Sequence, residues 1–227
     1  MTDRSASWAR VSATIEPAAS ANTAGISVLF AVTSFLSAAL VFIVEPMFAK
    51  MVLPLLGGSP AVWNTCLVFF QGALLAGYGY AHLITTRLTI AQQATLHAAL
   101  LVLAAMTLPV ALPVAWTPPV ETTPIPWLVL VLAVGLGAPF LMLSASAPLL
   151  QKWFSGTDHP AAQDPYFLYS ASNVGSILAL LSYPLLIEPS WPLPQQASMW
   201  SWVCSHRWRC GVSRSRAGRC GSGWRSG

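Results

Sequence analysis

Charged side chains are scarce in this chain. Only 8% of its 227 residues are Asp, Glu, Lys or Arg, whereas 55% are hydrophobic, and a typical soluble domain has about 25% charged residues. A soluble fold of this size needs charged side chains over its surface. The composition therefore excludes an ordinary soluble domain and indicates that lipid surrounds most of the chain.

Cysteine is scarce as well, with four residues in the whole chain. Cys66 lies in an apolar stretch, and Cys204, Cys210 and Cys220 lie near the C-terminus. This usage implies no disulfide framework. A metal site built from the last three cysteines and His206 is the weakest interpretation of that region, because no Cys-x-x-Cys pair is present. We expect no metal, no cofactor and no catalytic residue.

The chain contains several long apolar stretches without a charged residue. A helix needs about 20 apolar residues to cross about 30 Å of hydrocarbon, and the alternation typical of barrel strands is missing. The sequence predicts an all-α integral membrane protein with about five transmembrane helices in one bundle. A polar N-terminal segment, 1–25, would precede this domain, 26–190, whose expected helices are 26–44, 61–84, 94–115, 127–150 and 166–187.

Proline and glycine mark the expected ends and irregularities of these helices. Glu45-Pro46 and Glu188-Pro189 follow apolar runs and are expected to end the first and fifth helices, with both acids at the membrane interface. Alternatively, Glu45 and Glu188 form an acidic pair that attracts an organic cation. In the fourth helix, Gly135, Gly137 and Pro139 predict a kink or break near the middle, and Pro148 predicts another near the end.

The basic residues of the connections predict the orientation. Arg4, Arg10, Arg87 and Lys152 would share one side of the membrane and Lys50 the other. Because cytoplasmic loops carry an excess of Lys and Arg, we expect a multi-pass protein of the cytoplasmic (inner) membrane with a cytoplasmic N-terminus. With five spans and a cytoplasmic N-terminus, the C-terminal segment would lie outside the cytoplasm. This segment is rich in arginine, so that placement conflicts with the excess of Lys and Arg expected on the cytoplasmic side.

The C-terminal segment, 191–227, differs from the rest in composition. Residues 1–202 carry five basic and seven acidic groups, whereas residues 203–227 carry six Arg and no acid, together with several Trp, Cys, Gly and Ser. In a GC-rich gene, codons for Ala-Leu-Leu read one base later give Arg-Cys-Trp, so a frameshift near codon 200 explains this composition. The alternative is an arm that binds anionic lipid or nucleic acid. Of these two interpretations we favour the frameshift, so we expect no nucleic-acid partner. We expect this tail to be disordered.

Polar side chains form stripes on two of the expected helices. At 100° per residue, four side chains of the second helix fall within about 40° of one another: Asn64, Gln71, Tyr78 and His82. On the fifth helix, four side chains fall within about 80° of one another and form a second polar face: Tyr166, Tyr169, Asn173 and Ser176. These faces could meet and line a solute path, or they could join helices by hydrogen bonds.

Several segments resemble a known family. The chain is similar, over about residues 26–200, to the membrane half of the bacterial fused transporter-like/spermidine synthase-like proteins. The matching segments are Phe35–Thr65, Ala147–Phe154, Asp164–Ser176 and Tyr183–Pro189. The resemblance implies a multi-helix membrane region that is followed, in complete members, by an aminopropyltransferase domain that binds decarboxylated S-adenosylmethionine. It ends near Trp202, where the arginine-rich tail begins, which is consistent with truncation.

These observations give two expectations for function. No Gly-rich nucleotide-binding loop and no downstream acidic cluster of the implied synthase domain is present, so we expect no enzymatic activity. The first expectation is a membrane anchor or scaffold. The second is a transporter-like module for a small cationic solute such as a polyamine. The lipid bilayer is the expected partner, and polar faces left open could serve a homo-oligomer or a partner subunit.

Overall fold

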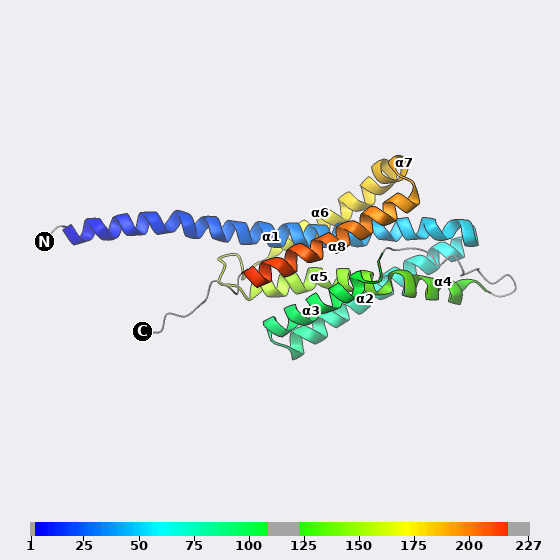
Figure 1. Ribbon diagram of the computed structural model, residues 1–227, viewed down its shortest axis with the longest axis horizontal. Coiled ribbons are helices and arrows are strands. Elements are labelled where there is room, and N and C mark those ends of the chain that lie inside the picture. Colours follow the sequence, from blue (N-terminus) through cyan, green and yellow to red (C-terminus); the bar gives the residue numbers. More distant parts are fainter. Residues whose placement is uncertain (1–2, 109–122, 218–227) are drawn as a thin grey trace.

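A computed structural model describes the backbone of residues 3–108 and 123–217, and the side chains of residues 24–108 and 123–205. Every regular element in these residues is a helix, which confirms the all-α prediction. Figure 1 shows their order along the chain: α1 (Asp3–Leu56), α2 (Pro60–Arg87), α3 (Ile90–Ala105), α4 (Ile125–Leu132), the π-helical turn η1 (Ala133–Gly137), α5 (Ala138–Ser155), α6 (Tyr166–Ser182), the π-helical turn η2 (Tyr183–Ile187), α7 (Glu188–Ser190) and α8 (Leu193–Ala217).

Four helical segments are long and apolar enough to cross a membrane. They are Ala24–Leu56, Pro60–Arg87, Ile125–Ser155 and Tyr166–Ser190, with 33, 28, 31 and 25 residues. The expected third span is represented by α3, which has 16 residues and is shorter than the roughly 20 that a span needs. Part of the expected interval 94–115 lies outside the described residues. The structure therefore supports four spans among these residues and does not confirm a fifth.

The first span continues past Glu45-Pro46, so the predicted helix end at this pair is wrong. Helix α1 runs on to Leu56. The segment after the proline carries Met47, Phe48 and Val52, whose side chains are 0% exposed. Because packing of these side chains favours a continuous helix, the single hydrogen-bond donor that Pro46 lacks does not end it. The helix ends only at Gly57, whose φ of 74° suits glycine.

The fourth span is irregular at one of its two predicted points. The residues from Ala133 to Gly137 form the π-helical turn η1, between α4 and α5, as the glycines there predict. At Pro148, the second predicted point, the helix does not break, because α5 continues to Ser155. Leu149 and Phe154, beyond the proline, are 0% exposed, and their packing holds this end of the helix in place.

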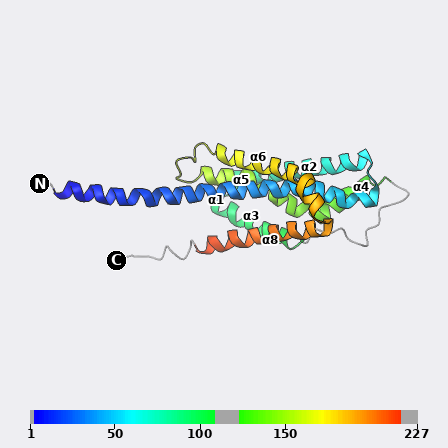
Figure 2. The same cartoon turned by 90° about the horizontal axis from the view of Figure 1, so that it is seen from above.

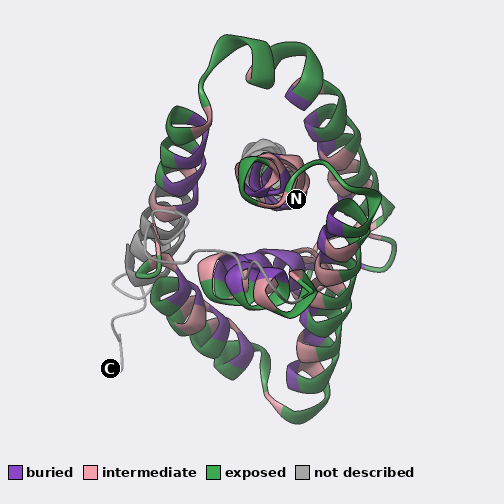
Figure 3. Ribbon diagram, turned by 90° about the vertical axis from the view of Figure 1, so that its right-hand side faces the viewer, coloured by how far each residue is buried: buried purple, intermediate pink, exposed green. Residues whose placement is uncertain are grey.

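Glycine permits two close helix contacts. A β-carbon on Gly175 of α6 would lie 2.5 Å from the carbonyl oxygen of Phe35 in α1, and a β-carbon on Gly77 of α2 would lie 3.0 Å from the Leu141 carbonyl oxygen in α5. Such distances are too short for a side chain, so α6 packs on α1 and α2 packs on α5 backbone to backbone. Figure 2 shows α6 and α5 beside α1. Figure 3, a view along the long axis, shows that the outer helices carry many exposed residues.

The chain returns along the bundle in α8, so the part of the expected disordered segment 191–227 that the structure describes is largely helical. The helix runs from Leu193 to Ala217, and its end lies at the same end of the bundle as the connection between α5 and α6 (Figure 1). Trp200 is 3% exposed, and its indole N–H donates to the Leu40 carbonyl of α1 over 2.8 Å. This contact anchors the first turns of α8. Residues 218–227 lie outside the described part.

Candidate functional site

A half-open cavity of about 380 Å³ lies where α1, α2, α5 and α6 meet. Its volume is within the range of small-molecule sites, about 300–1,000 Å³. None of the described side chains that line it is charged. Both apolar and neutral polar residues line it: Ala38, Val41, Phe42, Leu74, Tyr78, Leu143, Ser144, Ala147, Pro148, Gln151, Tyr169, Ser172, Asn173 and Ser176.

Four of the predicted polar residues meet at this cavity. Tyr78 comes from α2, and Tyr169, Asn173 and Ser176 come from α6. The two tyrosine side chains remain 47% and 59% exposed, so the cavity opens between α2 and α6. The two polar faces that the sequence places on separate helices thus come together in part.

The other three residues of the predicted stripe lie elsewhere. Asn64 lines a separate hollow of about 340 Å³ between α2 and α4. Gln71 and His82 are exposed on α2, and neither is among the residues that line the two cavities. The whole stripe therefore does not form one path, because only its Tyr78 level faces α6.

Two of the three serine hydroxyls of the cavity, those of Ser144 and Ser176, can accept hydrogen bonds. Ser176 Oγ donates to the Ser172 carbonyl over 3.0 Å, and Ser144 Oγ donates to the Leu141 carbonyl over 2.9 Å. Because each hydroxyl proton is used within its own helix, the oxygen lone pairs can face a ligand. The Asn173 amide has no hydrogen bond to another described residue and can both donate and accept. A solute with hydrogen-bond donors fits this lining.

Two prolines add backbone acceptors beside the cavity. A proline within a helix has no N–H for the carbonyl four residues earlier. Pro46 therefore leaves the Phe42 carbonyl without its helical donor, and Pro148 does the same for the Ser144 carbonyl. Phe42 and Ser144 both line the cavity.

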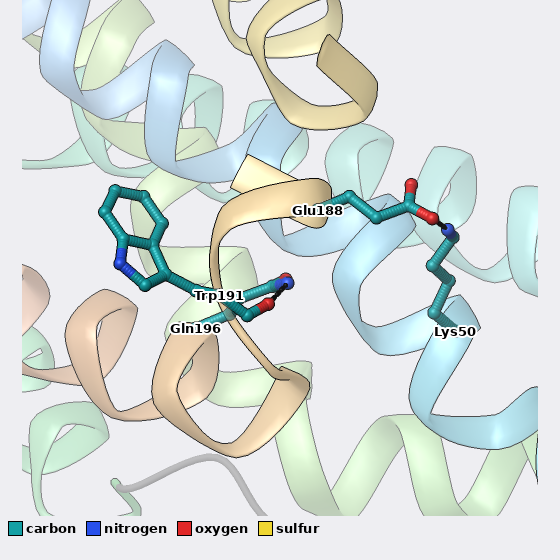
Figure 4. Close-up of polar contacts among 4 residues, drawn as sticks. All are labelled: Lys50, Glu188, Trp191 and Gln196. Atoms are coloured by element: carbon teal, nitrogen blue, oxygen red, sulfur yellow. Dashed lines mark hydrogen bonds and ion pairs between the residues drawn. The ribbon is translucent and has the colours of Figure 1, made fainter. Parts of the chain in front are cut away.

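The two acids that the sequence analysis grouped have different environments. Glu188 of α7 forms an ion pair with Lys50 of α1 (Figure 4). Glu45 lies within α1 rather than at its end, and its Oε1 is buried without a hydrogen-bond partner among the described residues. Beside the ion pair, the Gln196 side-chain amide donates to the Trp191 carbonyl over 2.7 Å and joins α8 to the turn before it (Figure 4).

A cluster of buried polar side chains, which the sequence analysis missed, joins α3 to α5. The Trp153 indole N–H donates to Gln93 Oε1 over 3.0 Å, and the amide nitrogen of Gln93 donates to the Leu88 carbonyl over 2.7 Å. One helical turn later, His97 Nε2 lies 3.2 Å from Ser146 Oγ. The spacing of Gln93 and His97, four residues apart on one helix face, was the available signal. These contacts hold helices together and lie away from the cavity.

The described residues contain no group of three or more His, Cys, Asp or Glu side chains placed to hold a metal ion. Cys204 is buried in α8, and the side chains of His206, Cys210 and Cys220 lie outside the described part. The fold and the cavity define an all-helical protein whose long apolar helices are suited to a membrane. Comparisons with protein-family models, curated proteins and solved structures gave no match.

Proposed function

We propose that this chain is a multi-pass membrane protein that binds a small polar solute, as a transporter-like module does. The observation that carries the proposal is the cavity at the level of Tyr78 and Asn173, inside helices long enough to span a bilayer. Polar groups within a membrane are costly unless they have partners, and they mark solute pathways. Hydroxyl, amide and carbonyl acceptors suit a solute that carries N–H donors, and an amine is the class we favour.

The arrangement of the basic residues supports the proposed orientation. Arg87 ends α2 and Lys152 lies in the last turn of α5, whereas Lys50 lies near the opposite end of the bundle, beside α7. Since α8 also returns toward the end that holds Arg87 and Lys152 (Figure 1), the arginines of α8 up to Ala217 would share that side with them, as the positive-inside rule favours. We therefore propose a cytoplasmic-membrane protein with a cytoplasmic N-terminus.

Two substitutions test the cavity. Binding of radiolabelled butylammonium and of the neutral butanamide is measured by equilibrium dialysis on the purified chain in lipid nanodiscs. Asn173→Leu removes an amide from the cavity and should weaken binding of both probes roughly tenfold, as expected for loss of about one hydrogen bond of 1.4 kcal/mol. Gln71→Leu is the matched control, because Gln71 is exposed on α2 outside the cavity.

The expected result is loss in Asn173→Leu with normal binding in Gln71→Leu. Equal affinities in the two variants, or no binding of either probe to the unmodified chain, would end the proposal. Both variants are checked by gel filtration and thermal unfolding, so that a folding defect is not taken for a binding defect.

A second function, membrane anchor or scaffold, is supported by the course of α8. Because α8 ends on the side that we propose to be cytoplasmic, it would place any following domain there, as the resemblance to the spermidine synthase-like fusion proteins implies. A reporter enzyme fused after Ala217 tests this. Cytoplasmic reporter activity is expected, and activity only outside the cytoplasmic membrane would contradict it.

A further inference from the structure

The cavity is elongated along the bundle. On α5 its lining runs from Leu143 to Gln151, which is about 12 Å along the helix axis. On α6 it runs from Tyr169 to Ser176, which is about 10 Å. Helix α5 ends and α6 begins at the same end of the bundle (Figure 1), and Gln151 and Tyr169 lie within about one helical turn of that end. The cavity therefore extends from the helix ends toward the middle of the spans.

The outer end of the cavity, at Gln151 and Tyr169, is polar. The amide and the phenol hydroxyl can each donate and accept hydrogen bonds, and neither side chain has a hydrogen bond to another residue that the structure describes. Lys152, the residue after Gln151, lies in the last turn of α5. Lysines at the ends of membrane helices extend into the headgroup region. This end of the cavity is thus expected at the membrane–water interface.

The inner end of the cavity is apolar, and it is formed by Val41, Phe42, Leu74 and Leu143. Its depth on α1 follows from an aromatic contact: Phe30 packs on Phe154 of α5, with ring centroids 5.4 Å apart. Phe154 lies beside the end of α5, and Val41 lies about 16 Å farther along α1 than Phe30. The apolar side chains thus belong to the middle of the spans.

Contacts between α2 and α5 give the same depth for Leu74. Gly77 lies against Ser144, whereas Ile84 clusters with Leu149, so α2 and α5 run in the same direction. Leu74, about one turn before Gly77, lies deeper than Ser144. The Ser144 hydroxyl donates within its own helix, so an alkyl chain beside it leaves no donor unpaired.

The opening of the cavity lies between two lipid-facing helices. Helix α2 packs on α5 and α6 packs on α1, whereas α2 and α6 have no extensive contact with each other. Leu75, on the side of α2 that carries Tyr78, is 70% exposed, and Ile177, one turn after Asn173 on α6, is 56% exposed. Both helices are long and apolar enough to span a membrane, so these side chains would contact lipid. The opening therefore leads into the bilayer.

We propose that the cavity binds a single-chain amphiphile that enters from the bilayer between α2 and α6. This inference rests on the proposed solute-binding function and names the class of its solute: one alkyl chain with an uncharged head that carries N–H donors, as in a fatty amide. The head binds Gln151 and Tyr169, and the chain lies against the apolar inner end. A charged head would have no counter-ion among the described side chains that line the cavity.

Photolabelling of the unmodified chain tests this orientation. Two dodecanamide probes carry a diazirine, one beside the amide and the other at the end of the alkyl chain. The purified chain is irradiated with each probe in lipid nanodiscs, and mass spectrometry locates the products. The first probe should label α5 and α6 near Gln151 and Tyr169, and the second should label Phe42, Leu74 or Leu143. Excess unlabelled dodecanamide should suppress both.

Labelling confined to lipid-facing residues such as Leu75 and Ile177, labelling that excess dodecanamide does not suppress, or the reverse positions of the two probes would overturn the inference. This measurement does not depend on the folding of a variant.

A substitution at the inner end separates this inference from the proposed function. Displacement of radiolabelled butanamide by dodecanamide is measured in nanodiscs. Leu74→Trp fills part of the inner end and should weaken dodecanamide binding roughly tenfold, whereas butanamide, which needs only the polar part, should bind normally. Leu75→Trp is the matched control, because Leu75 is exposed and does not line the cavity. Thermal unfolding checks the fold of both variants.

Equal dodecanamide affinity in the two folded variants would contradict the inference. If butanamide binds the unmodified chain and dodecanamide does not displace it, the solute-binding function stands and only the amphiphile fails. If neither compound binds, both proposals fail.

Discussion

Gly77 of α2 lies directly against Ser144 of α5. A β-carbon on Gly77 would be 3.2 Å from the Ser144 β-carbon and still closer to its hydroxyl oxygen. Ser144 lines the cavity, and Tyr78, the next residue along α2, lines it as well. The close contact that glycine permits therefore fixes two walls of the cavity relative to each other.

Substitution at this contact should separate α2 from α5. In Gly77→Leu the new side chain has no space, and overpacking of this kind costs about 1–3 kcal/mol of unfolding free energy. Gly79→Leu is the control, since a β-carbon there meets nothing within 4 Å. Thermal unfolding in detergent should show a lower midpoint for Gly77→Leu alone. A midpoint equal to that of Gly79→Leu would show that α2 and α5 do not touch at Gly77.

Alanine at Gly175 should be harmful although alanine favours helices. Its β-carbon would meet the Phe35 carbonyl oxygen at 2.5 Å, and that oxygen belongs to the α1 backbone. Because the clash can be relieved only by moving a helix, we expect Gly175→Ala to lose about 1–3 kcal/mol. Gly72→Ala has open space and should gain up to about 1 kcal/mol from helix propensity. Chemical unfolding should show a lower free energy of unfolding for Gly175→Ala and a higher one for Gly72→Ala. A higher free energy in both variants would contradict the α1–α6 contact.

Gln93 should be essential to the packing of α3. Gln93→Leu leaves the Trp153 N–H and the Leu88 carbonyl without their partner, and each unsatisfied buried group costs about 1–3 kcal/mol. Gln195→Leu changes an exposed glutamine of α8 and should have little effect. The measurement is thermal unfolding. Similar midpoints for the two variants would contradict the buried network.

Trp200 should decide whether α8 is protected from protease. Trp200→Ala removes a side chain that is 3% exposed and its hydrogen bond to Leu40, at a cost of about 3–5 kcal/mol. We expect α8 to detach and trypsin to cut at Arg207 and Arg209 much faster. Trp202→Ala is the control, because this side chain is 61% exposed. Equally fast cleavage of the unmodified chain would support the disordered tail that the composition suggested.

Helical class and apolar character could be predicted from the sequence because both depend on local composition. Four of the expected intervals correspond to the long apolar helices of the structure, and Gly135 and Gly137 correctly marked a change of helical geometry.

The errors arose where packing outweighs a local signal. Pro46 and Pro148 each remove one hydrogen-bond donor, yet buried side chains beyond them keep the helices continuous. The start of α8 was unpredictable for the same reason, because its composition suggests disorder while Trp200 is held by a residue 160 positions away.

The sequence by itself determined that polar side chains would share helix faces, because a period of 3.6 residues fixes which residues point the same way. Only the tertiary structure decided which of them meet. The register between α1 and α6 and the contact at Gly77 bring Tyr78 to Asn173 and leave Gln71 and His82 outside. Helix–helix register depends on the shapes of two surfaces far apart in the chain, and helical periodicity, a property of one segment, does not contain it.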